Sequence, residues 1–212
     1  MNIILASGSP RRYDLLKQMG WNVEVHSLPF AEAETVNEAA KRDEVLLSPY
    51  RHADLVCAYN ALGKGKAAAE VLGTAVPVIA ADTIVVLGET ILGKPADATD
   101  AKRMLRELSG RAHEVKTATA VLYLDKTVLK VVTTKVFFRR LTEKEIDWYV
   151  QTGEPLDKAG AYGIQGKGAV LVEKIEGSYD NVVGLPLTAV YEMLTKLKAE
   201  TESANQKREQ TH

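Results

Sequence analysis

The sequence predicts an α/β protein built on a mixed β-sheet, and two observations support this prediction. Short apolar runs alternate with segments of helical periodicity early in the chain, which is typical of strands joined by helices. Later, two long strand-like runs follow one another directly, which is typical of an antiparallel hairpin. A sheet that combines these two arrangements is mixed.

Composition limits the function classes. The chain has 212 residues, of which 46% are hydrophobic and 26% charged, so it can bury a substantial core. Its formal net charge of −1 argues against a general nucleic-acid binder. Cys57 is the only cysteine, which excludes an internal disulfide and is typical of a reducing compartment. The sequence contains no recognisable signal peptide and no apolar run of the ~20 residues that a membrane helix needs. We therefore expect a cytoplasmic protein without nucleic-acid or membrane partners.

The first elements are two short strands that flank a helix. Residues 2–6 are apolar apart from Asn2 and predict a buried strand, and residues 22–27 predict a second one. Between them, Ser9 is a good N-cap residue, Pro10 suits the first helical position, and Gly20 predicts the end of the helix. The chain therefore passes from a strand through a tight loop into a helix N-terminus.

A long helical region and a buried strand follow. Residues 37–72 are mainly helical in character, with an interruption near residues 48–49. Residues 76–87 form an apolar run that is interrupted only by Asp82 and Thr83. Because successive residues of this run are apolar, we expect a strand that is covered on both faces.

The next segment combines a helix with the antiparallel hairpin. Apolar residues at helical spacing predict a helix over residues 98–108. Residues 115–124 and 128–138 predict two antiparallel strands. Thr142 and Glu145 then form a capping-box pattern, which predicts the start of another helix.

The end of the chain is more irregular. Residues 153–168 are rich in glycine, residues 169–175 predict a strand, and residues 186–197 predict a final helix. From residue 199 to residue 212 the tail is polar and lacks apolar periodicity, so we expect disorder there. These patterns place a single domain at residues 1–198.

Two arginines stand where a helix N-terminus disfavours them. The first turn of a helix carries unpaired N–H groups and a partial positive charge, which favour Asp and Glu. Here the first turn holds Arg11 and Arg12, and each of these cations should destabilise the helix by roughly 0.3–1 kcal/mol. A bound anion would compensate, because both guanidinium groups, the N–H groups and the hydroxyls of Ser7 and Ser9 would form a phosphate site. Alternatively, both arginines project into solvent or pair with Glu residues. If the anion hypothesis is right, replacing either arginine should not reduce stability.

Asp82 is the second anomaly, because its carboxylate lies within an apolar strand. An unpaired buried charge is costly, so this side chain must be paired, hydrogen-bonded or bound to a metal. It is either a structural carboxylate at a strand end or bulge, or a metal ligand or general base that acts on water. Lys94 follows a hairpin that could fold it back toward Asp82, whereas surface exposure is the default expectation for Lys64 and Lys66.

Other kinds of site find little support in the sequence. The four histidines are scattered without metal-ligand spacing, which disfavours a zinc site. No P-loop motif and no strand-linked dinucleotide-binding motif occurs. If the protein uses a metal, carboxylates would bind it, which favours Mg²⁺ or Mn²⁺.

Five blocks of sequence in a fixed order carry a family resemblance. They are LASGSPRRYDLL, AADTIVVLGETILGKP, MLRELSGRAHEVKTA, GEPLDKAGAYGIQGKGAVLVEKIEGSY and VVGLPL. Together they resemble the Maf family of nucleoside triphosphate pyrophosphatases over residues 3–197. The resemblance implies an elongated mixed α/β fold with flanking helices and two lobes around a central cleft, similar to the inosine triphosphate pyrophosphatases.

The resemblance also assigns roles to individual residues. The catalytic proton acceptor of the family falls on Asp82, and the lysine of its GKP element falls on Lys94. Its anion-binding loop falls on five residues, namely Ser7, Ser9, Pro10, Arg11 and Arg12.

Two further assignments have rivals in this chain. The family's early acidic residue falls on Glu32, with Glu34 as the rival, and its mid-chain lysine falls on Lys66, with Lys64 as the rival. The chain departs from the family pattern over residues 37–60, and glycines on both sides of Lys64 replace the usual helix formers.

The implied reaction is hydrolysis of a nucleoside triphosphate to the monophosphate and pyrophosphate. Glu32 and Asp82 would hold one divalent cation, Mg²⁺ or Mn²⁺, and Asp82 would orient or deprotonate the water that attacks the α-phosphorus. Four cationic side chains would offset most of the substrate's charge: Arg11, Arg12, Lys66 and Lys94.

The resemblance is closest to the branch of the family that acts on dTTP and UTP. Arg11, Thr83 and Gln165 stand at the three positions that mark this branch. The amide of Gln165 complements the acceptor–donor–acceptor edge of thymine or uracil. The sister branch, which prefers 7-methyl-GTP, differs at these positions.

Two alternatives to this function stay open at this point. One is a pyrophosphatase of the 7-methyl-GTP branch, and the other is a nucleotide-binding regulator of septum formation that acts through protein contacts. A pure binding protein has no need of the Asp82 carboxylate beside bound phosphates, because it would repel them. A homodimer is the expected assembly.

Overall fold

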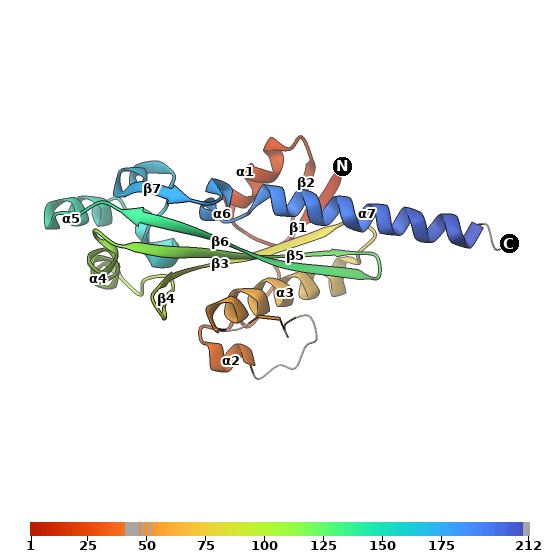
Figure 1. The fold of residues 1–212 in the computed structure, drawn as a ribbon, viewed down its shortest axis with the longest axis horizontal. Coiled ribbons are helices and arrows are strands. Elements are labelled where there is room, and N and C mark those ends of the chain that lie inside the picture. Colours follow the sequence, from red (N-terminus) through yellow and green to blue (C-terminus); the bar gives the residue numbers. More distant parts are fainter. Residues whose placement is uncertain (41–46, 48, 51, 210–212) are drawn as a thin grey trace.

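The structure is a computed structural model that describes residues 1–40, 47, 49–50 and 52–209. It is elongated along a seven-stranded mixed sheet of order β2-β1-β3-β5-β6-β7, with β4 paired to β3 outside this path (Figure 1). The strands are β1 (Asn2–Leu5), β2 (Asn22–Val25), β3 (Val78–Leu87), β4 (Thr90–Leu92), β5 (Ala112–Tyr123), β6 (Lys126–Phe138) and β7 (Val172–Glu176). The predicted α/β class with a mixed sheet and flanking helices is therefore confirmed, whereas the cleft between two lobes stays a prediction.

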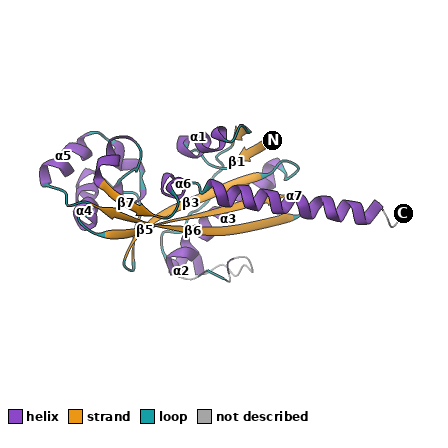
Figure 2. Ribbon diagram, turned by 45° about the horizontal axis from the view of Figure 1, so that its top comes forward, coloured by secondary structure: helices purple, strands orange, loops and turns teal. Residues whose placement is uncertain are grey.

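Helices flank the sheet, as Figure 2 shows in a second view. They are α1 (Pro10–Gln18), α2 (Val36–Ala40), α3 (His52–Leu72), α4 (Ala98–Leu108), α5 (Glu143–Gln151), α6 (Tyr179–Val183) and α7 (Leu187–Glu209). The helical region expected over residues 37–72 corresponds to α2 and α3. Residues 41–46, 48 and 51, which include part of the expected interruption, lie outside the described residues. None of the helices in the described chain is both long enough and apolar enough to cross a membrane.

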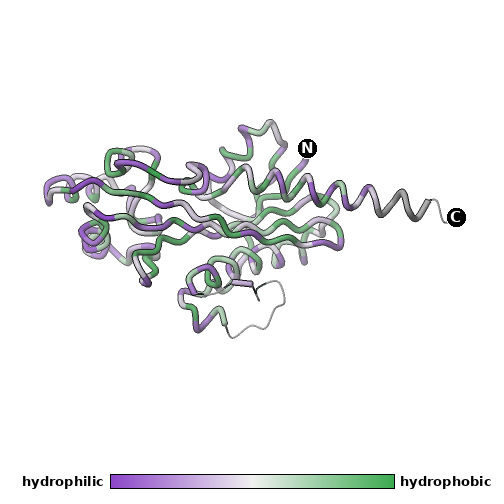
Figure 3. The backbone as a smooth tube through the Cα atoms, viewed as in Figure 1, coloured by the Kyte–Doolittle hydropathy of each residue, from purple (hydrophilic) through white to green (hydrophobic). Residues whose placement is uncertain are grey.

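Side chains alternate along β3 between two hydrophobic layers. Val78 and Ala80 belong to a cluster that packs under α3, whereas Ile79 and Ala81 belong to a cluster with α1 and α7 on the opposite face. This alternation follows from the two-residue period of a strand. Because both faces are covered, β3 is apolar on successive residues, and the central strands are largely green in Figure 3.

A third hydrophobic cluster lies at the other end of the sheet. It contains Val85 and Leu87 from β3 and packs them against α4 and α5. The helix α5 begins with the predicted capping box, in which the Thr142 side chain accepts from the Glu145 N–H and the Glu145 carboxylate accepts from the Thr142 N–H. The sheet thus spans three packed regions, and the middle of β3 lies where they meet.

β3 is continuous through Asp82 and Thr83, so these two residues interrupt the apolar run of the sequence but not the strand. At one edge, β5 pairs with β3 from Val78 to Val86. At the other edge, β1 pairs with Val78 and Ile79 and β4 pairs with residues 85–87. No strand of the described chain pairs with residues 80–84 at this edge. We call this stretch the edge gap, and Asp82 and Thr83 lie within it.

Several boundaries differ from the expectations. The second strand of the hairpin expected before Lys94 is β4, for which the sequence predicted no bounds, and α6 was not predicted as a separate element, because these elements have only three and five residues and carry little periodicity. β7 begins at Val172, and the residues just before it form a 3-10 turn. The helix α7 continues to Glu209 and extends beyond the sheet, where we expected a disordered tail (Figure 1). Good helix formers such as Ala199 and Glu200 favour this continuation, and Lys126 pairs with Glu200 at 2.8 Å.

The glycine-rich segment between α5 and β7 consists of short 3-10 turns that pack around two tyrosines. The Tyr149 hydroxyl accepts from the N–H of Gly163 at 3.1 Å, and the Tyr162 hydroxyl lies 2.7 Å from Nε2 of the buried His113. Burial lowers the pKa of His113 to about 4, so this imidazole is neutral near pH 7. Part of this segment is therefore packed into the core, with Ala161, Tyr162 and Gly168 buried.

Gly168→Ala tests this packing. Gly168 is buried, and a Cβ at this position would overlap the carbonyl oxygen of Gly163 and lie 2.6 Å from the Tyr149 hydroxyl. Because backbone must move, we expect a loss of about 1–3 kcal/mol in the free energy of unfolding, measured by chemical denaturation. Gly93→Ala is the control, since a Cβ there meets nothing within 4 Å. Equal stability of the two variants would contradict the packing argument.

Candidate functional site

Asp82 lies in the edge gap and faces α3. Its neighbours on the same face of β3, Ala80 and Ile84, belong to the cluster under α3. The residue is only 8% exposed, so its charge must be compensated by close partners. Oδ1 accepts from the Lys64 ammonium group at 2.7 Å, and Oδ2 accepts from the Asn60 amide at 3.2 Å. Both partners come from α3.

Glu32 completes this group from the loop between β2 and α2. Its Oε2 lies 3.0 Å from the Lys64 Nζ, so one ammonium group joins the Glu32 and Asp82 carboxylates. Glu32 is half exposed at 51%, whereas the side chain of Asp82 is 11% exposed. We call Glu32, Asn60, Lys64 and Asp82 the carboxylate cluster. It combines a buried carboxylate with one that solvent can reach.

Glycines on both sides of Lys64 let α3 approach its neighbours closely. A Cβ at Gly65 would lie 2.6 Å from Leu122 Cδ1 in the sheet, and a Cβ at Gly63 would overlap the Phe30 ring. Phe30 also packs against Tyr59, with ring centroids 5.4 Å apart. The unusual glycines therefore bring Lys64 toward both β3 and the loop that carries Glu32.

The structure distinguishes the rival lysines and the rival acids by position. Lys64 joins the carboxylate cluster, whereas Lys66 is exposed two residues further along α3. Residues two apart on a helix point in nearly opposite directions. Glu32 reaches Lys64, whereas Glu34 is exposed and its N–H donates to the Glu38 carboxylate. The sequence assignment to Lys66 thus differs from the contacts in the structure, which involve Lys64.

Thr83 faces away from Asp82, toward α1 and α6. Its hydroxyl accepts from Arg12 Nη2 at 3.1 Å and lies 2.9 Å from the Thr117 hydroxyl. Thr117 in turn donates to the carbonyl oxygen of Asn181 at 3.0 Å. Two consecutive residues of β3 therefore belong to different polar groups, on opposite faces of the sheet.

Arg12 connects three parts of the chain. Besides Thr83, its guanidinium group donates to Ser7 Oγ at 3.0 Å and to the carbonyl oxygen of Gly184 at 2.8 Å. Burial lowers the pKa of Arg12, while the nearby charges of Asp82 and Glu32 act in the opposite direction. The guanidinium group thus lies within electrostatic reach of the carboxylate cluster. Two of its partners belong to the segments that precede α1 and follow α6.

The α1 N-terminus remains suited to an anion. Ser9 is the N-cap residue as predicted, but its side chain makes no capping hydrogen bond, and the first turn has no acidic residue. The Ser7 hydroxyl is buried and accepts from the Ser9 N–H at 3.3 Å. Because the capping partner is lacking, helix N–H groups are left to bind an external acceptor.

Arg11 contacts the glycine-rich segment, and Gln165 is part of it. Arg11 Nη1 is 3.6 Å from Asp157 Oδ2, and both side chains are substantially exposed. Gln165 is exposed as well, whereas its neighbour Ile164 is buried in the cluster with α1. The Arg11–Asp157 pair and Ile164 therefore join the segment that carries Gln165 to α1.

Lys94 lies on the surface beyond β4. The hairpin of β3 and β4 is formed as expected, with Val85 opposite Leu92, and it returns the chain toward Asp82. Lys94 itself is exposed, and no hydrogen bond or ion pair joins it to another described residue. Its ammonium group therefore has no protein partner among the described residues that would compete with a ligand.

The carboxylate cluster also fits a divalent cation. The carboxylate oxygens of Glu32 and Asp82 converge on one positively charged atom, Lys64 Nζ. Within the described ranges, no group of three His, Cys, Asp or Glu side chains could hold a metal. Two protein carboxylates are sufficient for Mg²⁺ when substrate phosphates and waters supply the other ligands.

Sequence reasoning missed two residues of the site, Asn60 and Thr117. Asn60 precedes Lys64 by four residues, and this spacing on a helix puts both side chains on one face. That spacing is a signal in the sequence that could have identified Asn60. Thr117 lies opposite Thr83 in the β3–β5 register, which the sequence does not specify.

Comparisons of this chain with a family model and with known proteins agree with one another. The family model described as "Maf-like protein" matches residues 2–197. A Dictyoglomus thermophilum protein named dTTP/UTP pyrophosphatase is 48% identical over 92% of this chain and 95% of its own length. Proteins of the same name are 50% identical in Bacillus cytotoxicus, over 87% of this chain and 89% of theirs, and 45% identical in Salmonella typhimurium, over 93% of both.

The contacts of the two arginines predict different effects on stability. Arg12→Ala removes three hydrogen bonds and leaves buried acceptors, so we expect a loss of about 1–3 kcal/mol in the free energy of unfolding. Arg11→Ala removes one solvent-exposed ion pair and should change it by less than about 0.5 kcal/mol. Chemical denaturation measures both. The structure therefore predicts that Arg12→Ala lowers stability, whereas the sequence predicted no loss. Equal stability of the two variants would contradict the expectation from the structure.

Proposed function

Because this chain belongs to the Maf family, we propose that it hydrolyses dTTP and UTP to the monophosphate and pyrophosphate. The carboxylate cluster is the observation that carries the proposal, since it sets a buried carboxylate within electrostatic reach of Arg12 on the first turn of α1. The names of relatives at 45–50% identity support the choice of substrate. A cytoplasmic location and a homodimer stay expectations from the sequence.

The cationic side chains would neutralise the triphosphate. The α1 N-terminus supplies free N–H groups, and Arg11 and Arg12 lie on its first turn. Lys64 lies between the two carboxylates, and Lys94 is exposed beyond β4 without a protein partner in the described chain. Binding would draw Arg11 from its long contact with Asp157 toward phosphate, because a doubly charged phosphate group is the stronger partner.

Glu32 and Asp82 are the residues that would hold a divalent cation, Mg²⁺ or Mn²⁺. When bound, such a cation supplies charge neutralisation at the phosphates and lowers the pKa of water. Since Lys64 lies between the same two carboxylates, its ammonium group would move toward the substrate when the cation binds. Lys64 would then offset charge on the phosphates.

Asp82 would accept the proton of the attacking water. The water oxygen forms a bond to the α-phosphorus while the bond between this phosphorus and the bridging α–β oxygen breaks. The bridging oxygen leaves with the electron pair as part of pyrophosphate, and the proton passes to the Asp82 carboxylate. The hydrogen bond from the Asn60 amide would hold that carboxylate in place before the reaction.

The base would be recognised on the other side of β3. Thr83 faces Arg12 there, and the segment that carries Gln165 is joined to α1 by the Arg11–Asp157 pair. The Gln165 amide can donate to one carbonyl of thymine or uracil and accept from the ring N–H. The edge gap would let the nucleotide extend from this side to Asp82.

A panel of nucleoside triphosphates tests the proposal. Release of pyrophosphate is measured for dTTP, UTP, CTP, GTP and 7-methyl-GTP in the presence of Mg²⁺ or Mn²⁺. We expect rapid hydrolysis of dTTP and UTP, slower hydrolysis of CTP by about 5- to 150-fold because one polar pairing is lost, and little hydrolysis of purine triphosphates.

Protein with Asp82→Asn is the control for contaminating activity in this panel. Preference for 7-methyl-GTP or GTP over both dTTP and UTP would overturn the assignment of substrate. Binding of every nucleotide without release of pyrophosphate would overturn the assignment of an enzyme.

A further inference from the structure

Asn60 is a buried amide for which the reaction provides no direct role. It lies on α3 and is only 3% exposed. A buried amide is costly unless its donors and acceptor are satisfied, so its partners indicate what holds it there. Its hydrogen-bond partners among the described residues are Ala33, which directly follows Glu32 in the chain, and Asp82 on β3.

The amide makes three hydrogen bonds that define its orientation. Oδ1 accepts from the Ala33 N–H at 2.8 Å, and Nδ2 donates to the Ala33 carbonyl oxygen at 3.0 Å. The second hydrogen of Nδ2 is directed to Asp82 Oδ2 at 3.2 Å. A flipped amide would oppose donor to donor at Ala33, so the backbone of Ala33 fixes which end of the amide faces Asp82.

We propose that Asn60 is a positioning residue that holds the Glu32 loop and the Asp82 carboxylate in one geometry. The inference rests on the proposed function, because it concerns how that reaction is organised. Ala33 directly follows Glu32, so the two hydrogen bonds to its backbone fix the loop next to the acidic side chain. The third fixes the oxygen of Asp82 that Lys64 does not contact.

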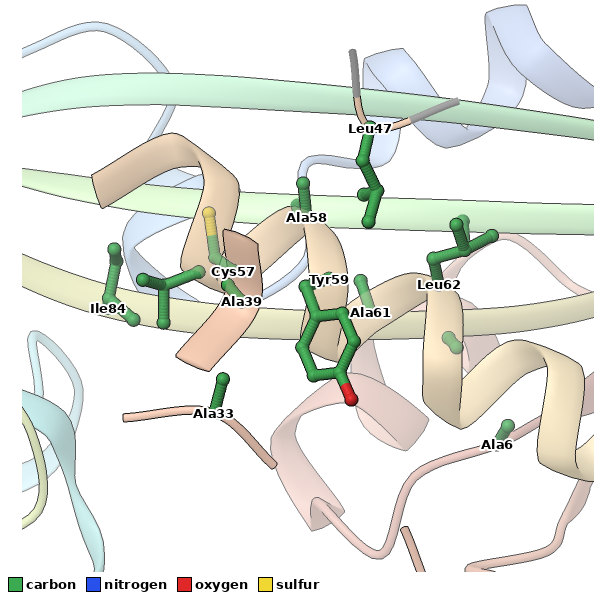
Figure 4. Packing of buried hydrophobic residues seen from close by; sticks show 14 of the residues in the cluster. Ala6, Ala33, Ala39, Leu47, Cys57, Ala58, Tyr59, Ala61, Leu62 and Ile84 are labelled. Carbon is green, nitrogen blue, oxygen red and sulfur yellow. The ribbon is translucent and has the colours of Figure 1, made fainter. Parts of the chain in front are cut away.

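The packing around Ala33 explains why hydrogen bonds are needed in addition to apolar contacts. Ala33 is buried under α3 in the same hydrophobic cluster as Ala39 and Tyr59 (Figure 4). The Ala33 side chain is a single methyl group. Its apolar contacts therefore limit how far the loop can move away from α3, but not how far the loop can slide along this helix. Glu32 is 51% exposed, and solvent-exposed loops are mobile unless their backbone is held. The Asn60 amide supplies that restraint.

The expected effect is on the chemical step. Small displacements of groups that act together on a substrate cost rate much more than they cost binding, because alignment matters most in the transition state. Loss of the Asn60 amide should therefore lower kcat about 10- to 100-fold, with a change in KM of less than about threefold. It should also expose the Ala33 N–H to solvent exchange.

Asn60→Leu tests the proposal, because it keeps a similar side-chain volume and removes all three hydrogen bonds. Leu62→Ala is the matched control: Leu62 is 1% exposed on the same helix, and its truncation weakens the same core without removing a hydrogen bond to Ala33 or Asp82. Both full-length variants are compared with wild type in dTTP hydrolysis, thermal unfolding and hydrogen exchange at the Ala33 amide. We expect lower kcat and faster exchange only in Asn60→Leu.

Three results would overturn this role of Asn60. One is Asn60→Leu with kcat within twofold of wild type and a protected Ala33 amide. Another is an equal loss of kcat in Leu62→Ala at an equal loss of melting temperature. Should Asn60→Leu not fold, Asn60→Ala is measured in the same way, and failure of both to fold would show that the residue serves only the core. Wild-type protein that hydrolyses no dTTP would contradict the proposed function instead, while the exchange measurement would still test whether Asn60 holds the Glu32 loop.

Discussion

The buried charge of Asp82 is the constraint on which the rest of the site depends. A carboxylate in the middle of β3 can remain ionised only with donors close by, and Lys64 and Asn60 provide them at 2.7 and 3.2 Å. Both donors come from one face of α3, which must therefore lie close to the sheet. Gly65 permits this approach, because a Cβ there would lie 2.6 Å from Leu122. The charge, its donors and the helix packing thus form one unit.

The edge gap leaves one edge of β3 without a strand partner from the described chain beside the buried charge. If a strand paired with residues 80–84 at this edge, its backbone would cover the space beside Asp82 and Thr83. Instead, β1 pairs with β3 only as far as Ile79, and β4 pairs with β3 only from Val85 onward. The loop that leads from β1 into α1 therefore begins next to the edge gap. Asp82 faces α3 and Thr83 faces α1, which separates the Asp82 carboxylate from the hydrogen bonds that Arg12 makes. A nucleotide that extends through the gap would reach both faces.

The sequence was sufficient to predict the architecture, but it was less informative about which side chains contact one another. The α/β class and the hairpin of β5 and β6 followed from periodicity, because burial on one or both faces imposes it directly. Asp82 could be singled out because a charge within an apolar run is costly wherever the strand lies. The choice between Lys64 and Lys66 could not be made this way, since it depends on how α3 is rotated against the sheet. Arg12 was likewise ambiguous, because its partners Ser7, Thr83 and Gly184 are distant in sequence.

The most direct test of this account compares Lys64→Met with Lys66→Met in dTTP hydrolysis. Both changes keep an unbranched side chain that is one atom shorter and remove its charge, and the two residues lie on the same helix. Because Lys64 contacts both Glu32 and Asp82, the account predicts that Lys64→Met lowers kcat/KM at least about 100-fold and that Lys66→Met lowers it by less than about threefold. Full activity of Lys64→Met together with loss of activity in Lys66→Met would contradict it.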